Sequence, residues 1–357
     1  MRPWIRRNRK QKSKQPAPSA GTSASAPGAD LIHADRNAEA APDPDRVFST
    51  IAEEWFSVSS TILKQSSQAR YRNILDIQLL PEFGQRDISQ ITRSDVMLFS
   101  SSMLTSGARN NEGLSPKTVT SVLSVLKLIF SYANHVKGIP VADIDGLNIK
   151  KKQKQLRVFT ISEQTTINNY LMEDITPSKL GILLGLYTGM RVGEICALSW
   201  GDISFDDQMI HVKKTMQRIQ LHEECKPRTR VVITAPKSIC SIRDIPIPEE
   251  LFRIIKDLKA DDDCFVLTGR PDRYIEPRTL ENHFNTMTKT CGIQGATMHT
   301  CRHSFATRCV ELGFDIKTLS EILGHASVSI TMNRYVHPSM EMKQQNMDKL
   351  SSLMTLP

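Results

Sequence analysis

A change in the hydrophobic pattern near the middle of the chain limits its possible folds more than any other feature. Between residues 47 and 148 apolar residues recur at helical spacing, and no strand-like alternation interrupts them. The basic sequence IKKKQKQLR follows at 149–157, and Thr160 and Glu163 then form a capping-box pattern that begins a new helix. Residues 158–338 mix helical and strand-like segments. We therefore expect two folded domains joined by a basic linker.

The first domain, 47–148, is predicted to be a bundle of about four helices. In the clearest of them, Ser115 suits the N-cap and Pro116 suits the first helical position. The four candidate helices are Phe48–Leu63, Gln68–Leu80, Ser94–Leu104 and Ser115–Val136.

The second domain, 158–338, is predicted to be mixed but mainly helical. Its candidate helices are Ser162–Glu173, Pro177–Tyr187, Val192–Leu198, Arg278–Cys291, His299–Leu312, Ile316–Leu323 and Ser327–Val336. Strand-like runs lie at Met209–Val212, Thr229–Thr234 and Ser241–Ile247. We expect the last two runs to pair as a hairpin with Lys237 at its turn. The predicted fold class is therefore α+β, mainly α, with a small antiparallel sheet in the second domain.

The net charge of +8 is unevenly distributed. Residues 1–14 contain seven Lys or Arg and no acidic residue, whereas 15–46 are slightly acidic and rich in Ala, Pro, Ser and Gly. We interpret 1–46 as a disordered basic arm and linker, and 339–357 as a C-terminal tail. The rest of the chain is only mildly basic, so its charge alone does not establish nucleic-acid binding.

Several classes of protein are disfavoured by composition. The longest apolar stretch is far shorter than the roughly 20 residues that span a bilayer, and the basic N-terminal segment does not resemble a secretory signal. The seven cysteines are an odd number and form no CxxC pair. This pattern argues against a disulfide framework or a zinc ribbon and favours a cytoplasmic protein.

Two separated motifs carry residues suited to phosphodiester chemistry. The sequence TGMRVGEICAL places Arg191 directly after a glycine turn, and His299 and Arg302 share one helix face further on. Cleaving a phosphodiester with a protein hydroxyl requires a nucleophile such as a tyrosine, cations for the developing charge and a general acid. Guanidinium groups are suited to stabilising the developing charge because they bind two phosphate oxygens at once.

These motifs, in this order, resemble those of the tyrosine recombinases, the phage integrase family. The first resembles TGxRxGEhxxL and the second resembles HxLRHTxAT followed by LGHxxxxxTxxYxH. The residues that match are Gly189, Arg191, Gly193, Glu194, Leu198, His299, Arg302, His303, Ala306, Thr307, Leu323, Gly324, His325, Thr331, Tyr335 and His337. The family's hairpin lysine and the pattern after it resemble Lys237, Ser241, Arg243, Ile245 and Pro246.

The resemblance implies a role for each matching residue. Tyr335 would be the nucleophile, Arg191 and Arg302 a phosphate clamp, and Lys237 the general acid. The imidazoles of His299 and His325 would handle protons and hydrogen bonds, and Glu194 would orient Arg191. His303 and His337 are expected to support the structure. Contacts to DNA are expected from Lys150, Lys151, Lys152, Lys154 and Arg243.

The implied activity is site-specific recombination, in which DNA strands are cleaved and rejoined through a 3′-phosphotyrosyl intermediate. Domain 47–148 would be the core-binding domain and 158–338 the catalytic domain. The partners would be double-stranded DNA and further copies of the chain, four in the synapse, with an accessory DNA-bending or excision factor as an additional partner. No metal, ATP or other cofactor is implied, because the energy of the phosphodiester is conserved.

Three other interpretations compete with this one. His299 and His303 have the i,i+4 spacing of zinc ligands, but Arg302 lies beside them and the HExxH glutamate is absent. Residues 316–336 look like a helix-turn-helix, which predicts a non-catalytic, sequence-specific DNA-binding protein. The same chemistry could also relax supercoils. The segment Gln217–Arg228 has no motif that we can interpret.

Overall fold

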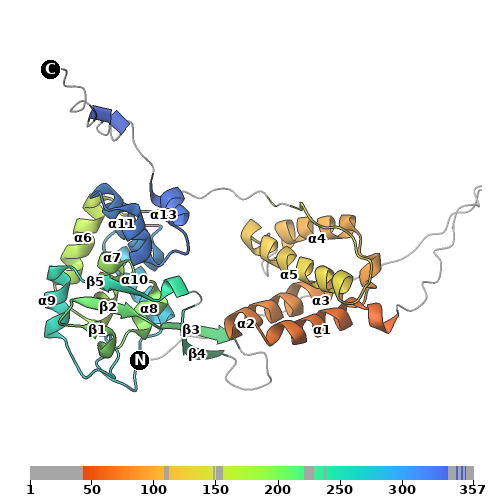
Figure 1. The fold of residues 1–357 in the computed structure, drawn as a ribbon, viewed down its shortest axis with the longest axis horizontal. Helices are drawn as coiled ribbons and strands as arrows, with labels where there is room; N and C mark the ends of the chain where they lie inside the picture. The colour runs from red at the N-terminus through yellow and green to blue at the C-terminus, as the bar shows by residue number, and fades with distance from the viewer. Residues whose placement is uncertain are drawn as a thin grey trace, which may run out of the picture. The chain divides into compact units, whose positions relative to one another are not determined.

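The computed structural model describes residues 43–107, 112–147, 149, 156–220, 229–236 and 239–336, together with 343–344, 347–348 and 350. Most of these residues are helical, with two small antiparallel sheets, as the sequence predicts (Figure 1). No helix in this described part is long and apolar enough to cross a membrane. Two large hydrophobic cores are present, one built from residues 48–144 and the other from 159–301.

The first core is built mainly from helices. They are α1 (Phe48–Ser60), α2 (Gln65–Ile74), a π-helical turn (Leu75–Leu79), α3 (Leu80–Phe83), α4 (Arg93–Ser106) and α5 (Pro116–His135). The cap predicted for α5 is present, because the Ser115 hydroxyl accepts a hydrogen bond from the Thr118 N–H. The helix predicted at Gln68–Leu80 is instead a longer series of α2, the π turn and α3. The π turn inserts extra backbone between α2 and α3 while Leu75 and Leu79 stay fully buried.

The described residues between 156 and 336 contain eight α-helices. Seven lie close to their predicted positions: α6 (Ile161–Met172), α7 (Pro177–Thr188), α8 (Val192–Ala197), α10 (Pro277–Thr290), α11 (Met298–Glu311), α12 (Ile316–Leu323) and α13 (Val328–Tyr335). The sequence analysis missed α9 (Glu249–Asp257), which buries Leu251, Phe252 and Ile255 on one face. A small third cluster joins α11, α12 and α13 through Ala306, Leu319, Leu323 and Tyr335.

The strands correct one prediction. The strand β4 (Thr229–Thr234) pairs with β3 (Thr215–Gln220), with Thr234 opposite Thr215. The other sheet has the order β1 (Ile203–Ser204), β2 (Met209–Val212), β5 (Arg243–Pro246), and all its pairs are antiparallel. The predicted hairpin between 229–234 and 241–247 is therefore wrong. Part of the uninterpreted segment Gln217–Arg228 supplies the true partner strand, in which Met216 and Ile219 are buried.

Two glycine turns place the motif residues. Helix α7 ends at Gly189 and α12 ends at Gly324, both in the left-handed conformation with φ of 65° and 64°. A Cβ atom on Gly189 would lie 2.5 Å from the Phe305 ring, and one on Gly324 would lie 2.9 Å from Cδ of Arg243. Both positions therefore require glycine for conformation and for space. The two turns let the chain pass close to α11 and β5.

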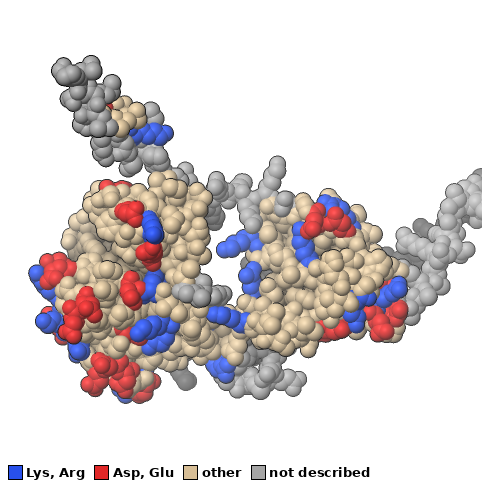
Figure 2. All heavy atoms as spheres, in the orientation of Figure 1, with Lys and Arg blue, Asp and Glu red and all other residues tan. Residues whose placement is uncertain are grey.

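Surface charge is mixed around the second core. Acidic and basic side chains are interspersed on the face shown in Figure 2. Arg253 and Glu249 form one of the exposed ion pairs of this part of the chain. Such exposed pairs add little stability. The arginines of the predicted site are different, because Arg243 and Arg302 are both buried.

Candidate active site

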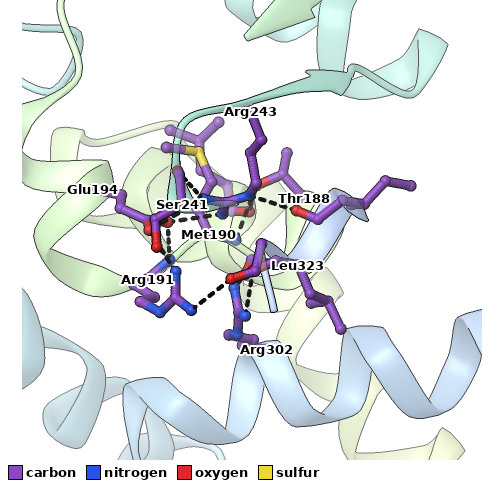
Figure 3. Close-up of polar contacts among 12 residues, drawn as sticks. Thr188, Met190, Arg191, Glu194, Ser241, Arg243, Arg302 and Leu323 are labelled. Carbon is purple, nitrogen blue, oxygen red and sulfur yellow. Dashed lines mark hydrogen bonds and ion pairs between the residues drawn. The ribbon is translucent and has the colours of Figure 1, made fainter. Parts of the chain in front are cut away.

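The C-terminal end of α12 holds three arginines that come from three separate segments. Arg243 Nε donates to the Ile322 carbonyl at 2.6 Å, and Arg302 Nη2 donates to the Leu323 carbonyl at 2.6 Å. Arg191 Nη2 lies 3.4 Å from the carbonyl of Gly324. Figure 3 shows Arg191, Arg243 and Arg302 gathered around Leu323. The last carbonyls of a helix have no partner within the helix and carry its negative dipole end. This helix end therefore fixes three guanidinium groups in one place.

A buried carboxylate links two of these arginines. Glu194, only 3% exposed, accepts hydrogen bonds from Arg191 Nη1 at 2.8 Å and from both Nη atoms of Arg243 at 3.1 and 2.9 Å. Burial raises the pKa of Glu194, but the hydrogen bonds and charges of Arg243, with the charge of Arg191, lower it further, so the net shift is downward. Glu194 therefore stays ionised. Its contact with Arg191 agrees with the spacing argument, whereas its bidentate pair with Arg243 was not foreseen.

Arg302 and Arg191 differ in their exposure. Arg302 is 3% exposed and also donates to the carbonyl of Gly189 at 2.6 Å. Burial, together with the charges of Arg191 and Arg243, lowers the pKa of Arg302 to about 9, so the group remains charged at pH 7. The Arg191 side chain is 35% exposed. The exposed Arg191 can attract an anion from solvent, and the buried Arg302 can hold that anion as a fixed, poorly hydrated cation.

Tyr335, the last residue of α13, lies among three histidines. Its hydroxyl is 2.8 Å from Nδ1 of His303. The rings of His303 and His299 pack edge to face, with their centroids 4.9 Å apart. The His325 ring is parallel to the Tyr335 ring, with their centroids 6.3 Å apart. Nδ1 of His325 is 2.8 Å from the Thr331 hydroxyl. The Tyr335 side chain is almost fully buried.

The electrostatics of this cluster keep it neutral. Burial, followed by nearby positive charges, lowers the pKa of His303 and of His325 to about 4 and also lowers that of His299. Burial raises the pKa of Tyr335, although Arg302 and Arg334 oppose the shift. At pH 7 the imidazoles are therefore uncharged and the phenol keeps its proton.

The structure thus gathers most of the predicted site residues. Arg191, His299, Arg302, His325 and Tyr335 interact electrostatically in one cluster, with Glu194 behind them. The predicted DNA contacts at Lys150, Lys151, Lys152 and Lys154, and the predicted acid Lys237, lie outside the described residues.

Two placements differ from the sequence-based expectation. Arg243 was expected to contact DNA, but its guanidinium is enclosed in the protein and bound to Glu194 and main-chain carbonyls. Arg334, whose charge acts on Tyr335, was not singled out, although it directly precedes Tyr335 in the sequence. Within the described ranges, no group of three or more His, Cys, Asp or Glu side chains could hold a metal ion.

The low pKa values predict how stability depends on pH. The folded protein keeps His303 and His325 neutral down to about pH 4, whereas the unfolded chain protonates them below about pH 6.5. Unfolding therefore takes up protons in this window, and the free energy of unfolding falls as the pH falls from 6.5 to 4, by at most about 1.4 kcal/mol per pH unit for each histidine.

Urea denaturation at several pH values between 7 and 4 measures this slope. We expect a shallower slope for His325→Asn than for wild type, because Asn cannot be protonated. The control is His135→Asn, at the exposed end of α5, which should keep the wild-type slope. Equal slopes for wild type and His325→Asn would contradict the buried, neutral state of His325.

Comparisons with known proteins agree with this geometry. The family model described as "Phage integrase family" matches residues 153–342, and "Phage integrase, N-terminal SAM-like domain" matches 47–104. A tyrosine recombinase XerC-like protein of Caldanaerobacter subterraneus subsp. tengcongensis is 28% identical over 68% of this chain and 68% of that protein. The ICEBs1 integrase of Bacillus subtilis is 25% identical over 79% of this chain and 76% of its own.

Solved structures share the fold. The Tn1549 transposon integrase in complex with a circular intermediate DNA aligns with a TM-score of 0.70 at 19% identity, covering 85% of this chain and 99% of that one. A lambda integrase tetramer bound to a Holliday junction aligns with a TM-score of 0.62 at 17% identity, and the alignment covers 86% of this chain and 82% of that one. The phage integrase family model alone matches more than half of the residues of this chain, and the chain therefore belongs to the phage integrase family, the tyrosine recombinases.

Proposed function

We propose that this protein is a site-specific DNA recombinase that cleaves and rejoins DNA strands through a 3′-phosphotyrosyl intermediate. The observation that carries the proposal is the convergence of Tyr335 with Arg191, Arg302 and a cluster of neutral histidines. Arg191 directly precedes α8, His299 and Arg302 lie on α11, His325 follows α12 and Tyr335 ends α13, so only the folded chain brings them together.

The two arginines would hold the scissile phosphate. The two described hydrogen bonds of Arg302 use two of its five N–H donors, so three remain for phosphate oxygens. Arg191 is the more exposed of the pair and would meet the phosphate first. As the phosphorus becomes five-coordinate its oxygens gain negative charge, which fixed guanidinium groups stabilise without reorganising. Glu194 and the α12 end keep both groups in position.

The remaining groups would manage the bonds and protons. Tyr335 Oη would attack phosphorus, the bond to the 5′ oxygen would break, and Lys237 would supply the proton to that oxygen. A 5′ hydroxyl of the partner strand would then attack the phosphotyrosine and release Tyr335. One phosphodiester replaces another at each step, so the reaction as proposed requires neither ATP nor a metal ion. His299 and His325 would donate hydrogen bonds to the phosphate.

Double-stranded DNA and further copies of the chain are the proposed partners. Solved relatives of the same fold are described on DNA, one of them as a tetramer on a Holliday junction. We infer that residues 47–148 bind DNA beside the catalytic residues, that the lysines of 149–157 contact its backbone, and that four protomers form the synapse. Such binding would weaken with added salt. An accessory DNA-bending or excision factor belongs to the same proposal.

Non-catalytic DNA binding is less well supported. The helix-turn-helix interpretation accounts for α12, Gly324 and α13, all of which are present. It gives no role to the three arginines on the end of α12 or to the phenol held by His303. Because α12 itself positions those arginines, its arrangement serves the catalytic interpretation equally well.

Covalent trapping tests the proposal. A nicked duplex that spans the end of the DNA element encoding this chain is incubated with wild-type protein and a chelator, then resolved on a denaturing gel. We expect a band of protein joined to the 3′-phosphate side of the break, and peptide mapping should locate the DNA on Tyr335. Attachment to a 5′ phosphate or to another residue would refute the mechanism. Retained binding without any covalent band would support the non-catalytic alternative.

A further inference from the structure

The proposed mechanism leaves one proton without a destination. Tyr335 must lose its phenolic proton when it attacks phosphorus, and Lys237 is assigned to the leaving oxygen instead. Nδ1 of His303 lies 2.8 Å from Tyr335 Oη, within hydrogen-bond distance of that proton. From the sequence, His303 was expected only to support the structure.

The charge states of the two groups and the tautomer of His303 together set the direction of this hydrogen bond. His303 is neutral at pH 7, because burial and the charges of Arg334 and Arg302, with His299 beside it, lower its pKa to about 4. The phenol of Tyr335 is protonated, because its pKa is raised. We assign the His303 proton to Nε2, the tautomer in which Nδ1 accepts and the phenol donates.

The groups around Tyr335 leave His303 as the best-placed acceptor. Nδ1 of His325 is engaged with Thr331, and the His325 ring stacks parallel to the phenol. Arg334 and Arg302 approach as cations and have no acceptor atom. The His299 ring packs edge to face with that of His303, and no hydrogen bond between His299 and the phenol is present among the described residues.

We propose that His303 receives the phenolic proton of Tyr335 during cleavage and returns it during rejoining. The inference rests on the proposed function. In cleavage the Oη–P bond forms as the P–O5′ bond breaks, the phenolic proton moves to Nδ1, and Lys237 protonates O5′. In rejoining each transfer reverses, so His303 ends as it began. The group touches the reacting oxygen and is therefore a catalytic residue.

Bound DNA would strengthen His303 as a base at the step where it is needed. The charge of Arg302 lowers the pKa of His303 in the free protein. A phosphate held by Arg302 would offset that charge, and the negative charge that grows on the phosphorane would stabilise an imidazolium beside it. General-base catalysis is most efficient when the pKa of the base lies near the working pH.

Two substitutions separate proton transfer from positioning. In His303→Asn the amide oxygen replaces the Nδ1 acceptor but cannot take a proton, whereas His303→Phe removes both. Each should slow single-turnover cleavage by roughly 10²–10⁴-fold, with DNA binding unchanged. The matched control His211→Asn, on β2 and paired with Asp244, should cleave at the wild-type rate. Near-wild-type cleavage by His303→Asn but not by His303→Phe would show a positioning role only and overturn the proposal.

A substrate with sulfur in place of the bridging 5′ oxygen distinguishes base from acid. A thiolate leaves without a proton, so this substrate should restore cleavage by Lys237→Ala but leave His303→Asn slow. Restoration of His303→Asn by sulfur would make His303 an acid and overturn the proposal. Wild-type rates for His303→Asn on both substrates would also overturn the proposal for His303, but they would leave the recombinase function supported. Failure of wild type to form any covalent complex would overturn the function and the inference together.

Discussion

Replacing Tyr335 with phenylalanine is expected to abolish the covalent protein–DNA complex completely while leaving DNA binding within about twofold of wild type. The substitution keeps the aromatic ring that packs in the α11–α13 cluster and removes only the attacking oxygen. No other hydroxyl is placed by the described structure against Nδ1 of His303. Denaturing gels measure the covalent complex, and native gels with the same duplex measure binding.

The loss of the hydroxyl should also lower stability slightly. The buried Tyr335–His303 hydrogen bond disappears and Nδ1 of His303 is left without its partner, which costs about 1–3 kcal/mol of unfolding free energy. Urea denaturation shows whether the variant remains folded under the assay conditions. Tyr274→Phe is the matched control, since Tyr274 is 40% exposed and packs edge to face on Phe265. A covalent band that survives in Tyr335→Phe would mean that another residue is the nucleophile.

The sequence predicted the helices best where local signals bound them. Helix α12 was predicted at its observed residues; Gly324 permits the left-handed turn at its end, and the structure shows Asp315 capping its start. Helix α5 was located by Ser115 and Pro116 in the same way. Caps and glycine turns act within a few residues, so they can be recognised without knowledge of the tertiary fold.

Strand pairing was predicted less well, because partners are chosen over longer distances. The run Thr229–Thr234 was assigned to the following strand, which is close in sequence, but it pairs with β3. That strand, with the sequence TMQRIQ, alternates only weakly and lies partly in a segment without a motif. Helix α9 was missed despite the helical spacing of its buried apolar residues, which is a signal that the sequence does contain.

Motif spacing identified the site residues, but not their contacts. Spacing predicted that Glu194 could reach Arg191, because the two lie three residues apart. The bond between Glu194 and Arg243 spans 49 residues and the one between His303 and Tyr335 spans 32, so neither follows from local pattern. Arg243, which matches the family pattern, was assigned to DNA, and only the tertiary structure shows that it is buried.

Removing the Glu194 carboxylate should cause the largest loss of stability. In Glu194→Leu the Arg243 guanidinium, whose side chain is 5% exposed, loses the partner that neutralises it. Breaking a buried ion pair in this way costs about 3–5 kcal/mol, because an unpaired charge remains in the interior. Urea denaturation measures the effect. The exposed pair of Arg253 with Glu250 gives the control, since Glu250→Leu should change the unfolding free energy by less than about 1 kcal/mol.

A double variant separates the ion pair from the rest of the site. Arg243→Met alone should cost less than Glu194→Leu, because Glu194 keeps Arg191 and the Arg191 backbone N–H as partners. Combining the two removes both charges, and we expect the double variant to be more stable than Glu194→Leu. Cleavage should not recover with stability, because Arg191 still lacks the carboxylate that orients it. If Glu194→Leu and Glu250→Leu lost equal stability, Glu194 would not be holding the two arginines.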